Sequence, residues 1–198
     1  MSATMLITSN QRRYESQFMK KHLTLTSILI AAIVSVFALT YFMKMDSFAF
    51  SWALNFLLMM WVSAFVEASK NPLTSAYYHE KRWEQKGKLY ELIGINYFRK
   101  LLVLIGWEKV IRKSNPIEKS TATLVNLHHQ TKKSELGHLI IWYIVLGFTV
   151  FVAFQFGVLK SIWLLILNIL LNLYLVLLQR YNRPRIQRAI NLSQRRMA

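Results

Sequence analysis

Four long apolar runs, each without a charged residue, divide the chain. They cover Leu23–Met43, Phe48–Val66, Leu139–Leu159 and Ile162–Leu178. A helix rises 1.5 Å per residue, so about 20 residues cross the roughly 30 Å hydrocarbon core of a bilayer. Short loops join the first run to the second and the third to the fourth. The pattern therefore predicts an all-α integral membrane protein with four transmembrane helices in two hairpins.

The segments around these runs are polar, and they set the expected division of the chain. We expect a single membrane domain over residues 1–198, with no room for a large soluble enzyme beside it. Its expected parts are a cytoplasmic N-terminus (1–22), a first helical hairpin (23–66), a cytoplasmic and interfacial segment (67–137), a second helical hairpin (138–178) and a basic cytoplasmic tail (179–198).

The segment 67–137 mixes charged, aromatic and apolar residues. Gly94 and Gly106 interrupt its apolar stretch between residues 92 and 111, and its charges fall on opposite sides of a helical wheel. We therefore expect two short interfacial helices, hinged near Gly106. A simple membrane-surface linker is the alternative. The expected membrane anchors are Trp83, Tyr90, Tyr97 and Trp107.

Positive charge is concentrated on one predicted side of the membrane. The chain has 25 Lys and Arg against 9 Asp and Glu, a net charge of +16. The two hairpin loops hold only Lys44 and Lys160 of these cations. By the positive-inside rule, both termini and the central segment are expected in the cytoplasm, around a multi-pass protein of the bacterial cell (inner) membrane. Basic residues that flank apolar runs favour anionic lipid or an anionic substrate as partner, and not nucleic acid.

The residue inventory excludes several kinds of chemistry. No cysteine is present, which removes disulfides, thiolate metal sites and cysteine nucleophiles. The single aspartate, Asp46, falls on the predicted opposite side of the membrane, so a Ser-His-Asp triad is not expected. His128 and His129, with Glu135 and His138, form only a loose group, and we expect no metal ion. Glycine-rich phosphate loops are missing, and no cofactor is indicated.

A histidine and a carboxylate stand just before the third apolar run. Glu135 and His138 are three residues apart, so they share one face of a helix. A histidine at the membrane surface can act as a general base near neutral pH, and Glu135 would orient its ring. In the alternative, Glu135 lies at the positive end of a helix dipole and His138 is an interfacial polar residue.

The chain leaves the last apolar run through Gln-Arg-Tyr-Asn-Arg-Pro-Arg, residues 179–185. Pro184 is expected to end the helix, so that the guanidinium groups fan out around a turn. Arginine forks suit planar phosphates and carboxylates. The alternative is a positive-inside stop signal with snorkelling arginines.

Two asparagines, Asn168 and Asn172, lie within the fourth apolar run and share a helix face. Polar groups inside a membrane usually point into the bundle and often have a function. The alternative is interhelical hydrogen bonding, with Asn55 or Gln155 as a partner.

Three motifs resemble one known family. Residues 179–185, preceded by Asn172, are similar to the C-terminal signature of the bacterial glycosyl-4,4'-diaponeurosporenoate acyltransferases, which act in carotenoid biosynthesis. Residues 131–138 (TKKSELGH) and 83–90 (WEQKGKLY), the latter followed by Gly94-Ile95, also resemble this family and occur in the same order. The resemblance covers roughly residues 77–190.

The resemblance implies an acyltransferase. It would move an acyl group onto a hydroxyl of a membrane lipid or glycolipid-like acceptor, such as a glycosyl carotenoid, at the cytoplasmic leaflet. The donor would be an activated acyl group, with a thioester as the expected form. His138 would act as base and Glu135 as its partner. The residues expected to bind substrate or stabilise the oxyanion are Arg180, Arg183, Arg185, Asn172, Asn182, Trp83 and Tyr90.

A second function remains open from the sequence. The chain could be a non-catalytic membrane protein that binds anionic lipid or stabilises a partner enzyme, because each motif also has a structural explanation. Lipid analysis separates the two functions. Loss of an acyltransferase leaves one under-acylated species, whereas loss of a scaffold lowers the amount of its partner.

Overall fold

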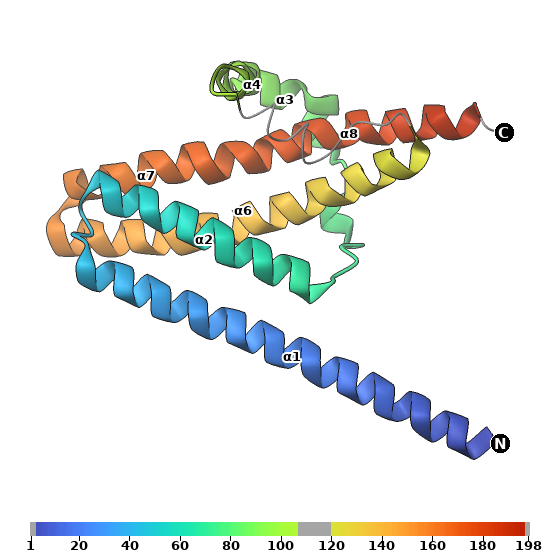
Figure 1. Ribbon diagram of the computed structural model, residues 1–198. Helices are drawn as coiled ribbons and strands as arrows, with labels where there is room; N and C mark the ends of the chain where they lie inside the picture. The colour runs from blue at the N-terminus through green and yellow to red at the C-terminus, as the bar shows by residue number, and fades with distance from the viewer. Residues whose placement is uncertain (1–2, 107–119, 197–198) are drawn as a thin grey trace.

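Four long helical segments form the molecule, and their arrangement follows the apolar pattern (Figure 1). The computed structural model describes residues 3–106 and 120–196, and all regular structure within these ranges is helical. Helices α1 (Ala3–Phe42) and α2 (Phe48–Ser69) form the first hairpin. The second pairs α6 (Thr121–Phe156) with a composite segment of α7 (Ile162–Asn168), a π-helical turn (Ile169–Leu173) and α8 (Tyr174–Arg195).

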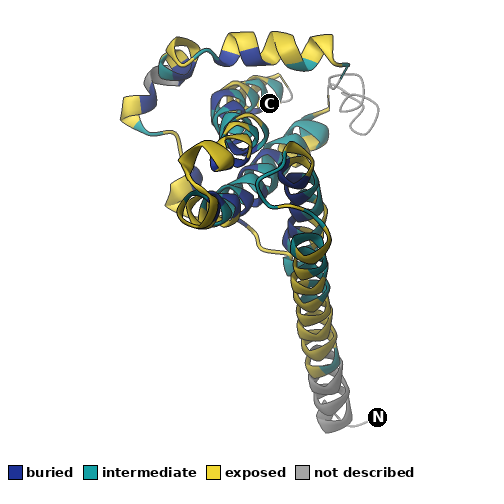
Figure 2. Ribbon diagram, turned by 90° about the vertical axis from the view of Figure 1, so that its left-hand side faces the viewer, coloured by how far each residue is buried: buried dark blue, intermediate teal, exposed yellow. Residues whose placement is uncertain are grey.

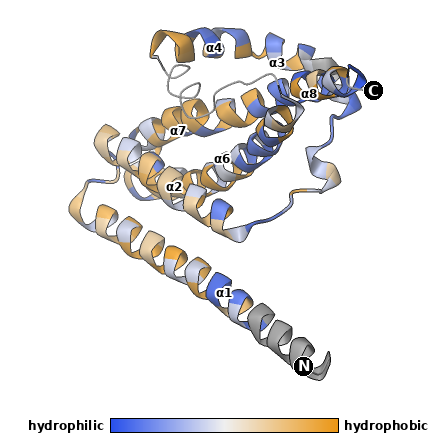
Figure 3. Ribbon diagram, turned by 45° about the vertical axis from the view of Figure 1, so that its right-hand side comes forward, coloured by the Kyte–Doolittle hydropathy of each residue, from blue (hydrophilic) through white to orange (hydrophobic). Residues whose placement is uncertain are grey.

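All four segments are long and apolar enough to cross a membrane, which confirms the predicted fold class. The first residues of α1 and α6 and the last residues of α2 and α8 lie toward one end of the bundle, and the two hairpin loops lie at the other (Figure 1). We call the first of these the polar end, because hydrophilic residues collect there on α6 and α8 (Figure 3).

Local sequence explains where the helices begin and end. Ser47 caps α2 by accepting a hydrogen bond from the Phe50 backbone N–H at 3.1 Å, and Ser120 caps α6 through Thr123. Such side-chain caps satisfy N–H groups that have no partner within the helix. Gly157 ends α6 with a φ of 99°, a conformation that only glycine adopts without strain, and it begins the second hairpin turn.

The helices extend beyond the apolar runs at the polar end. Helix α6 begins at Thr121, inside the segment expected to precede the second hairpin, and runs antiparallel to α8. The hydroxyls of Thr121 and Ser193 are 2.6 Å apart near the far end of this pair. Helix α1 likewise begins within the N-terminal segment that was expected to be separate from the first span.

The expectation that Pro184 ends a helix is wrong. Pro184 lies inside α8, which continues to Arg195. Proline within a helix removes one backbone hydrogen bond and costs about 3 kcal/mol. Here the helix is held on both sides of the proline, because Arg183 before it and Ile190 after it are both buried. Tertiary packing therefore outweighs the local preference, and the arginines lie along a helix instead of around a turn.

The core of the bundle lies between α2, α6 and α7, where large apolar side chains are fully buried, as the dark-blue interior in Figure 2 shows. Helix α1 is peripheral and diverges from the other helices toward its N-terminus (Figure 1). One polar contact joins it to α2, the hydrogen bond from Trp61 Nε1 to Ser35 Oγ at 2.9 Å. The fully buried apolar residues of this core are Phe50, Leu54, Val145, Val152 and Leu164.

The segment between the hairpins contains several short helices, and α4 corresponds to the first of the two that were expected. After the turns η1 (Ala76–Tyr78) and η2 (Arg82–Gly87) come α3 (Lys88–Leu92) and α4 (Ile95–Leu104). Helix α4 appears end-on in Figure 1 and lengthwise in Figure 2, so it crosses the bundle direction and lies as an interfacial helix would.

The expected membrane anchors differ in their surroundings. Trp83 and Tyr97 are exposed, as anchors should be. Tyr90 is instead buried in a small core with Ile95 and Tyr181, so the prediction that it is a surface anchor is wrong. Helix α4 ends at Leu104, two residues before Gly106, and the expected second interfacial helix, with Trp107, lies outside the described residues.

Gly87 joins the interfacial segment to α8. Its φ is 97°, and a β-carbon there would lie 3.1 Å from the Tyr181 ring. We therefore expect Gly87→Ala to lower the melting temperature of the purified protein. Gly94→Ala is the matched control, since Gly94 has a similar φ of 88° but its β-carbon would meet only Tyr97 at 3.8 Å. Both changes carry a backbone cost of about 1–2 kcal/mol. Equal melting temperatures for the two variants would show that the Tyr181 contact is unimportant.

Candidate functional site

Two arginines of α8 share one buried carboxylate of α6 at the polar end. The Glu135 side chain has no exposed surface. Its Oε1 accepts a hydrogen bond from Arg180 Nε at 2.7 Å, and its Oε2 accepts one from Arg183 Nη2. A buried carboxylate is tolerated only when it is paired and hydrogen-bonded. Glu135 therefore ties α6 to α8 just beyond the apolar part of the bundle.

A second carboxylate extends the pairing to the interfacial segment. Arg180 Nη1 donates to Glu84 Oε1 at 2.8 Å, and the Tyr90 hydroxyl donates to the same oxygen at 2.6 Å. The Lys81 backbone N–H donates to Glu84 Oε2. Burial alone would raise the pKa of Glu84, but the hydrogen bonds from Tyr90, Lys81 and Arg180 outweigh it and hold that pKa below its usual value. We call Glu84, Glu135, Arg180 and Arg183 the ion-pair network.

Adjacent tyrosines complete the surroundings of both arginines. Arg180 donates to the Tyr77 carbonyl and lies 4.5 Å from the centre of the Tyr77 ring. Arg183 donates to the Tyr78 carbonyl at 3.2 Å and lies 5.4 Å from the Tyr78 ring. Arg183 also donates to the Thr131 hydroxyl. These contacts use the planar, multi-donor form of the guanidinium group, which lysine lacks.

The third arginine of the motif has a different position. Arg185 is partly exposed, donates to Glu91 at 3.2 Å and stacks 3.5 Å from the centre of the Tyr181 ring. The Tyr181 hydroxyl donates to the same Glu91 oxygen at 2.9 Å. Arg185 therefore fastens α3 to the outside of α8, whereas Arg180 and Arg183 lie at the interface of α6 and α8.

A cluster of polar side chains lies one helical turn from Glu135, toward the apolar part of the bundle. His138 Nδ1 is 3.2 Å from Asn172 Oδ1. Asn172 Nδ2 donates to Asn55 Oδ1 at 2.7 Å and to Asn168 Oδ1 at 2.9 Å. This cluster, which we call the asparagine cluster, joins α2, α6 and the π-helical turn. It confirms that Asn55 is the partner of Asn172 within the bundle.

The hydrogen bonds of the asparagine cluster determine the tautomer of His138. The Nδ2 groups of Asn168 and Asn55 donate to the backbone carbonyls of Trp142 and Ser51, which can only accept. Their Oδ1 atoms must therefore face Asn172 Nδ2, and Asn172 Oδ1 must face His138. Because Oδ1 can only accept, His138 Nδ1 carries the proton. In the neutral ring, Nε2 then has a free lone pair.

His138 Nε2 makes no hydrogen bond to any residue that the structure describes. The residue itself is half-buried. A histidine with a fixed tautomer and an unused Nε2 lone pair has the arrangement that a general base requires.

The predicted partnership of Glu135 with His138 is not formed. The two residues share a helix face, as expected, but the Glu135 oxygens bind arginines and the histidine ring is oriented by Asn172. Trp83 is exposed, and Asn182 is half-buried without a hydrogen bond to another described residue. The structure thus brings Arg180, Arg183 and Glu135 together in the ion-pair network, with Tyr90 bound to Glu84 beside it. His138 lies one turn from Glu135, and Asn172 about two turns from Arg180.

Sequence reasoning missed several members of the site. Glu84 was noted only as part of a motif, and Tyr78 and Thr131 were assigned no role. The composition does contain a signal for Glu84. The chain has only 9 Asp and Glu against 25 Lys and Arg, and a buried arginine needs a carboxylate partner, so each carboxylate is a candidate for such a pair.

Two cavities lie near these groups, at different depths. A polar cavity of about 540 Å³ opens beside the ion-pair network. It is lined by Tyr78, His79, Glu80, Glu84, His128, Lys132, Arg180, Arg183, Pro184, Gln187, Arg188 and Asn191. Volumes of 300–1,000 Å³ are typical of small-molecule sites.

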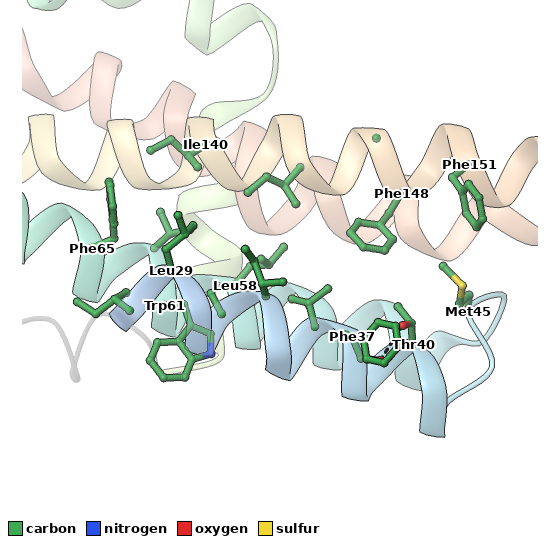
Figure 4. A pocket seen from close by; sticks show the side chains of 17 residues that line it. Leu29, Phe37, Thr40, Met45, Leu58, Trp61, Phe65, Ile140, Phe148 and Phe151 are labelled. Carbon is green, nitrogen blue, oxygen red and sulfur yellow. Dashed lines mark hydrogen bonds between the residues drawn. The ribbon is translucent and has the colours of Figure 1, made fainter. Parts of the chain in front are cut away.

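The second cavity is a larger apolar cleft of about 830 Å³ between α1, α2 and α6, lined mainly by aliphatic and aromatic side chains (Figure 4). Ile140, Phe148 and Phe151 face it from α6. Ile140 lies about 200° around the helix from His138, at 100° per residue. The apolar cleft is therefore on the other side of α6 from the candidate base.

These features define a helical membrane protein with a charged, ligand-sized site at one end of its bundle. A sequence profile of the glycosyl-4,4'-diaponeurosporenoate acyltransferase family matches residues 74–192, which is more than half of the chain, and the protein belongs to this family. The matched region contains the ion-pair network, His138, Asn168 and Asn172, whereas α1 and α2 lie outside it. No curated protein and no solved structure shows a significant match to the chain.

Lysine substitutions should show that Arg183 and Arg185 contribute differently to stability. Arg183→Lys keeps the charge but cannot reach Glu135, Thr131 and the Tyr78 carbonyl together, so we expect a clear loss of thermal stability in detergent. Arg185→Lys is the matched control, because its pairing with Glu91 is partly exposed and such pairs contribute about 0–1 kcal/mol. Equal melting temperatures in the two variants would contradict a structural role for Arg183.

The tautomer of His138 can be observed directly. In protein labelled with ¹⁵N-histidine, the His138 signals, identified by their loss in His138→Gln, should report a protonated Nδ1 and an unprotonated Nε2 above the ring pKa. Asn172→Leu removes the acceptor and should shift the ring toward the other tautomer. A dominant Nε2–H form in the unmodified protein would contradict the hydrogen-bond assignment.

Proposed function

We propose that the protein transfers an acyl group onto a hydroxyl of a glycolipid-like acceptor, such as a glycosyl carotenoid, with His138 as general base. The main observation is the geometry of His138: its Nδ1 is held by Asn172, and its Nε2 is bound to no described residue, one turn of α6 from Glu135. Membership of an acyltransferase family supports the reaction class.

In the proposed reaction, His138 carries one proton from the acceptor hydroxyl to the leaving thiol. Nε2 removes the proton from the acceptor hydroxyl while the hydroxyl oxygen attacks the carbonyl carbon of an acyl thioester. The tetrahedral intermediate then collapses, the C–S bond breaks, and the proton passes from His138 to the leaving sulfur. The products are an ester and a free thiol, and no covalent enzyme intermediate is needed. Asn172 keeps the ring oriented throughout and stabilises its protonated form.

Asn172 has no N–H left for an oxyanion. Both of its Nδ2 hydrogens already donate, one to Asn55 and one to Asn168. We therefore assign it a positioning role. Asn182 does not fit the predicted oxyanion role, because it lies ten residues beyond Asn172, about 15 Å along the helix. Trp83, which is exposed on the interfacial segment, remains a candidate contact for the acceptor.

The ion-pair network supports this reaction by positioning. Glu135 fixes α8 against α6. His138 lies one turn further along α6, and Asn172 lies about two turns before Arg180 on the other segment. We infer that Arg180 and Arg183 act mainly through this pairing, since their charges are balanced by Glu84 and Glu135.

We further propose that the polar end faces the cytoplasm of a bacterial cell. The distribution of lysine and arginine supports this orientation through the positive-inside rule. The acceptor would then lie in the inner leaflet with its head group near His138, and the donor would approach from the aqueous side.

His138→Ala tests the base. Loss of a general base lowers turnover about 10²–10⁴-fold. The assay is lipid analysis of cells that make the acceptor, at matched levels of membrane-inserted protein, and the variant should accumulate the under-acylated acceptor. His22→Ala is the control, because it also removes an imidazole but lies on α1, away from the site. Near-normal acylation by the His138→Ala protein would overturn the assignment, and loss of a partner enzyme in place of acylation would indicate a scaffold.

A further inference from the structure

The polar cavity holds two cations that form no ion pair with a carboxylate of the described residues. Lys132 Nζ donates to the Leu73 backbone carbonyl at 3.2 Å, and Arg188 Nε donates to the Pro184 carbonyl at 3.3 Å. Both acceptors are neutral. Of the salt bridges between described residues, none includes Lys132 or Arg188.

The other charges that line the cavity are largely cancelled. Arg180 and Arg183 pair with Glu84 and Glu135, which balances two cations against two carboxylates. Beyond these pairs, Lys132 and Arg188 face only one further lining carboxylate, Glu80, which is exposed. The cavity therefore keeps excess positive charge, in a concave site where an anion would gain from both groups.

Tyrosine, histidine and amide side chains add hydrogen-bonding groups to this positive charge. Tyr78 is buried, and its ring lies 5.7 Å from the Lys132 ammonium group. His128 lines the same wall. A cationic pair beside neutral donors and an aromatic surface suits a phosphate that is joined to a larger organic group, more than it suits an isolated carboxylate.

The depth of the two cations indicates which phosphate they meet. Lys132 lies seven residues before the third apolar run, and Arg188 ten residues after the fourth, which is about 10 Å and 15 Å along the helices. The headgroup layer on each side of a bilayer is only about 5–8 Å thick. Both groups therefore extend past the phosphates of lipids toward water.

We propose that Lys132 and Arg188 form a phosphate-binding subsite for the phosphate-bearing end of a water-soluble acyl thioester. This assignment rests on the proposed function for the identity of the ligand as acyl donor. Lys132 and His138 are six residues apart, about 9 Å along α6. The donor must therefore carry an extended linker between its phosphate and its thioester carbonyl.

Binding of free coenzyme A provides the test, because it requires no turnover. The full chain is placed in nanodiscs of zwitterionic phosphatidylcholine and titrated by calorimetry. Lys132→Gln and Arg188→Gln should each weaken binding about tenfold, as expected for loss of one charge-assisted contact. Lys133→Gln is the matched control: it removes the same charge from the next residue, but Lys133 pairs with Glu67 outside the cavity.

Arg188→Gln keeps the test independent of folding. Lys132 also holds the Leu73 carbonyl, so its loss could disturb the neighbouring loop, whereas Arg188 bonds only to its own helix. Unchanged coenzyme A binding in Arg188→Gln overturns the subsite. In a second arm, native mass spectrometry counts phosphatidylglycerol retained from anionic nanodiscs. Absent coenzyme A binding, with lipid retention that depends on Lys132 and Arg188, overturns the donor assignment in favour of a lipid headgroup.

A kinetic comparison separates this proposal from the proposed function. With an acyl-coenzyme A donor, Arg188→Gln should raise KM, whereas the same acyl group on N-acetylcysteamine, which has no phosphate, should show no change. His138→Ala should lose turnover with both donors and still bind coenzyme A. If His138→Ala retains turnover, the base assignment fails while the binding result stands. If Arg188→Gln alters both donors equally, the phosphate subsite fails while the base assignment stands.

Discussion

The buried charge of Glu135 is the constraint on which the polar end depends. A carboxylate without exposed surface is costly unless both oxygens are paired, and here each oxygen receives a different arginine of α8. One of those arginines also binds Glu84 and so holds the interfacial segment. A single side chain on α6 thereby sets the positions of two other parts of the chain.

Polar groups continue from this pairing into the apolar bundle. Thr131, Glu135 and His138 follow one stripe of α6, and Asn172 meets the stripe from the opposite helix. Polar side chains at membrane depth are costly and are often functional. In this protein each hydrogen bond of the asparagine cluster has a defined donor and acceptor, and together they orient the ring of His138.

The fold was predictable because it follows from composition. Four apolar runs of bilayer length predicted four spans, and the structure has a long apolar helical segment over each of these runs. The site was only partly predictable. Spacing correctly placed Glu135 and His138 on one helix face. It carries no information about side chains on another helix, and Glu135 binds two arginines of α8 instead of His138. The prediction that Pro184 ends the helix failed for the same reason, because buried residues on both sides of the proline hold the helix in place.

Tertiary contacts also decided what the tyrosines and asparagines do. Tyr90 has the sequence surroundings of a surface anchor, yet Glu84 and Arg180 draw it into the interior. The partnership of Asn172 with Asn55 joins residues 117 positions apart, and no local pattern specifies it. Sequence could identify these residues as unusual, whereas only the assembled helices show which of them meet.

The π-helical turn at Ile169–Leu173 has a consequence for how the last helical segment can vary. Asn172 lies within this turn, and Arg180 and Arg183 follow on the same continuous helix. All three must keep one rotational phase relative to α6. Deleting a single residue from the α-helical stretch between this turn and Arg180 would turn everything beyond it by about 100°, and would separate the arginines from Glu135. The number of residues between Asn172 and the two arginines is therefore fixed. An insertion or deletion between them would disrupt the ion-pair network and the asparagine cluster together.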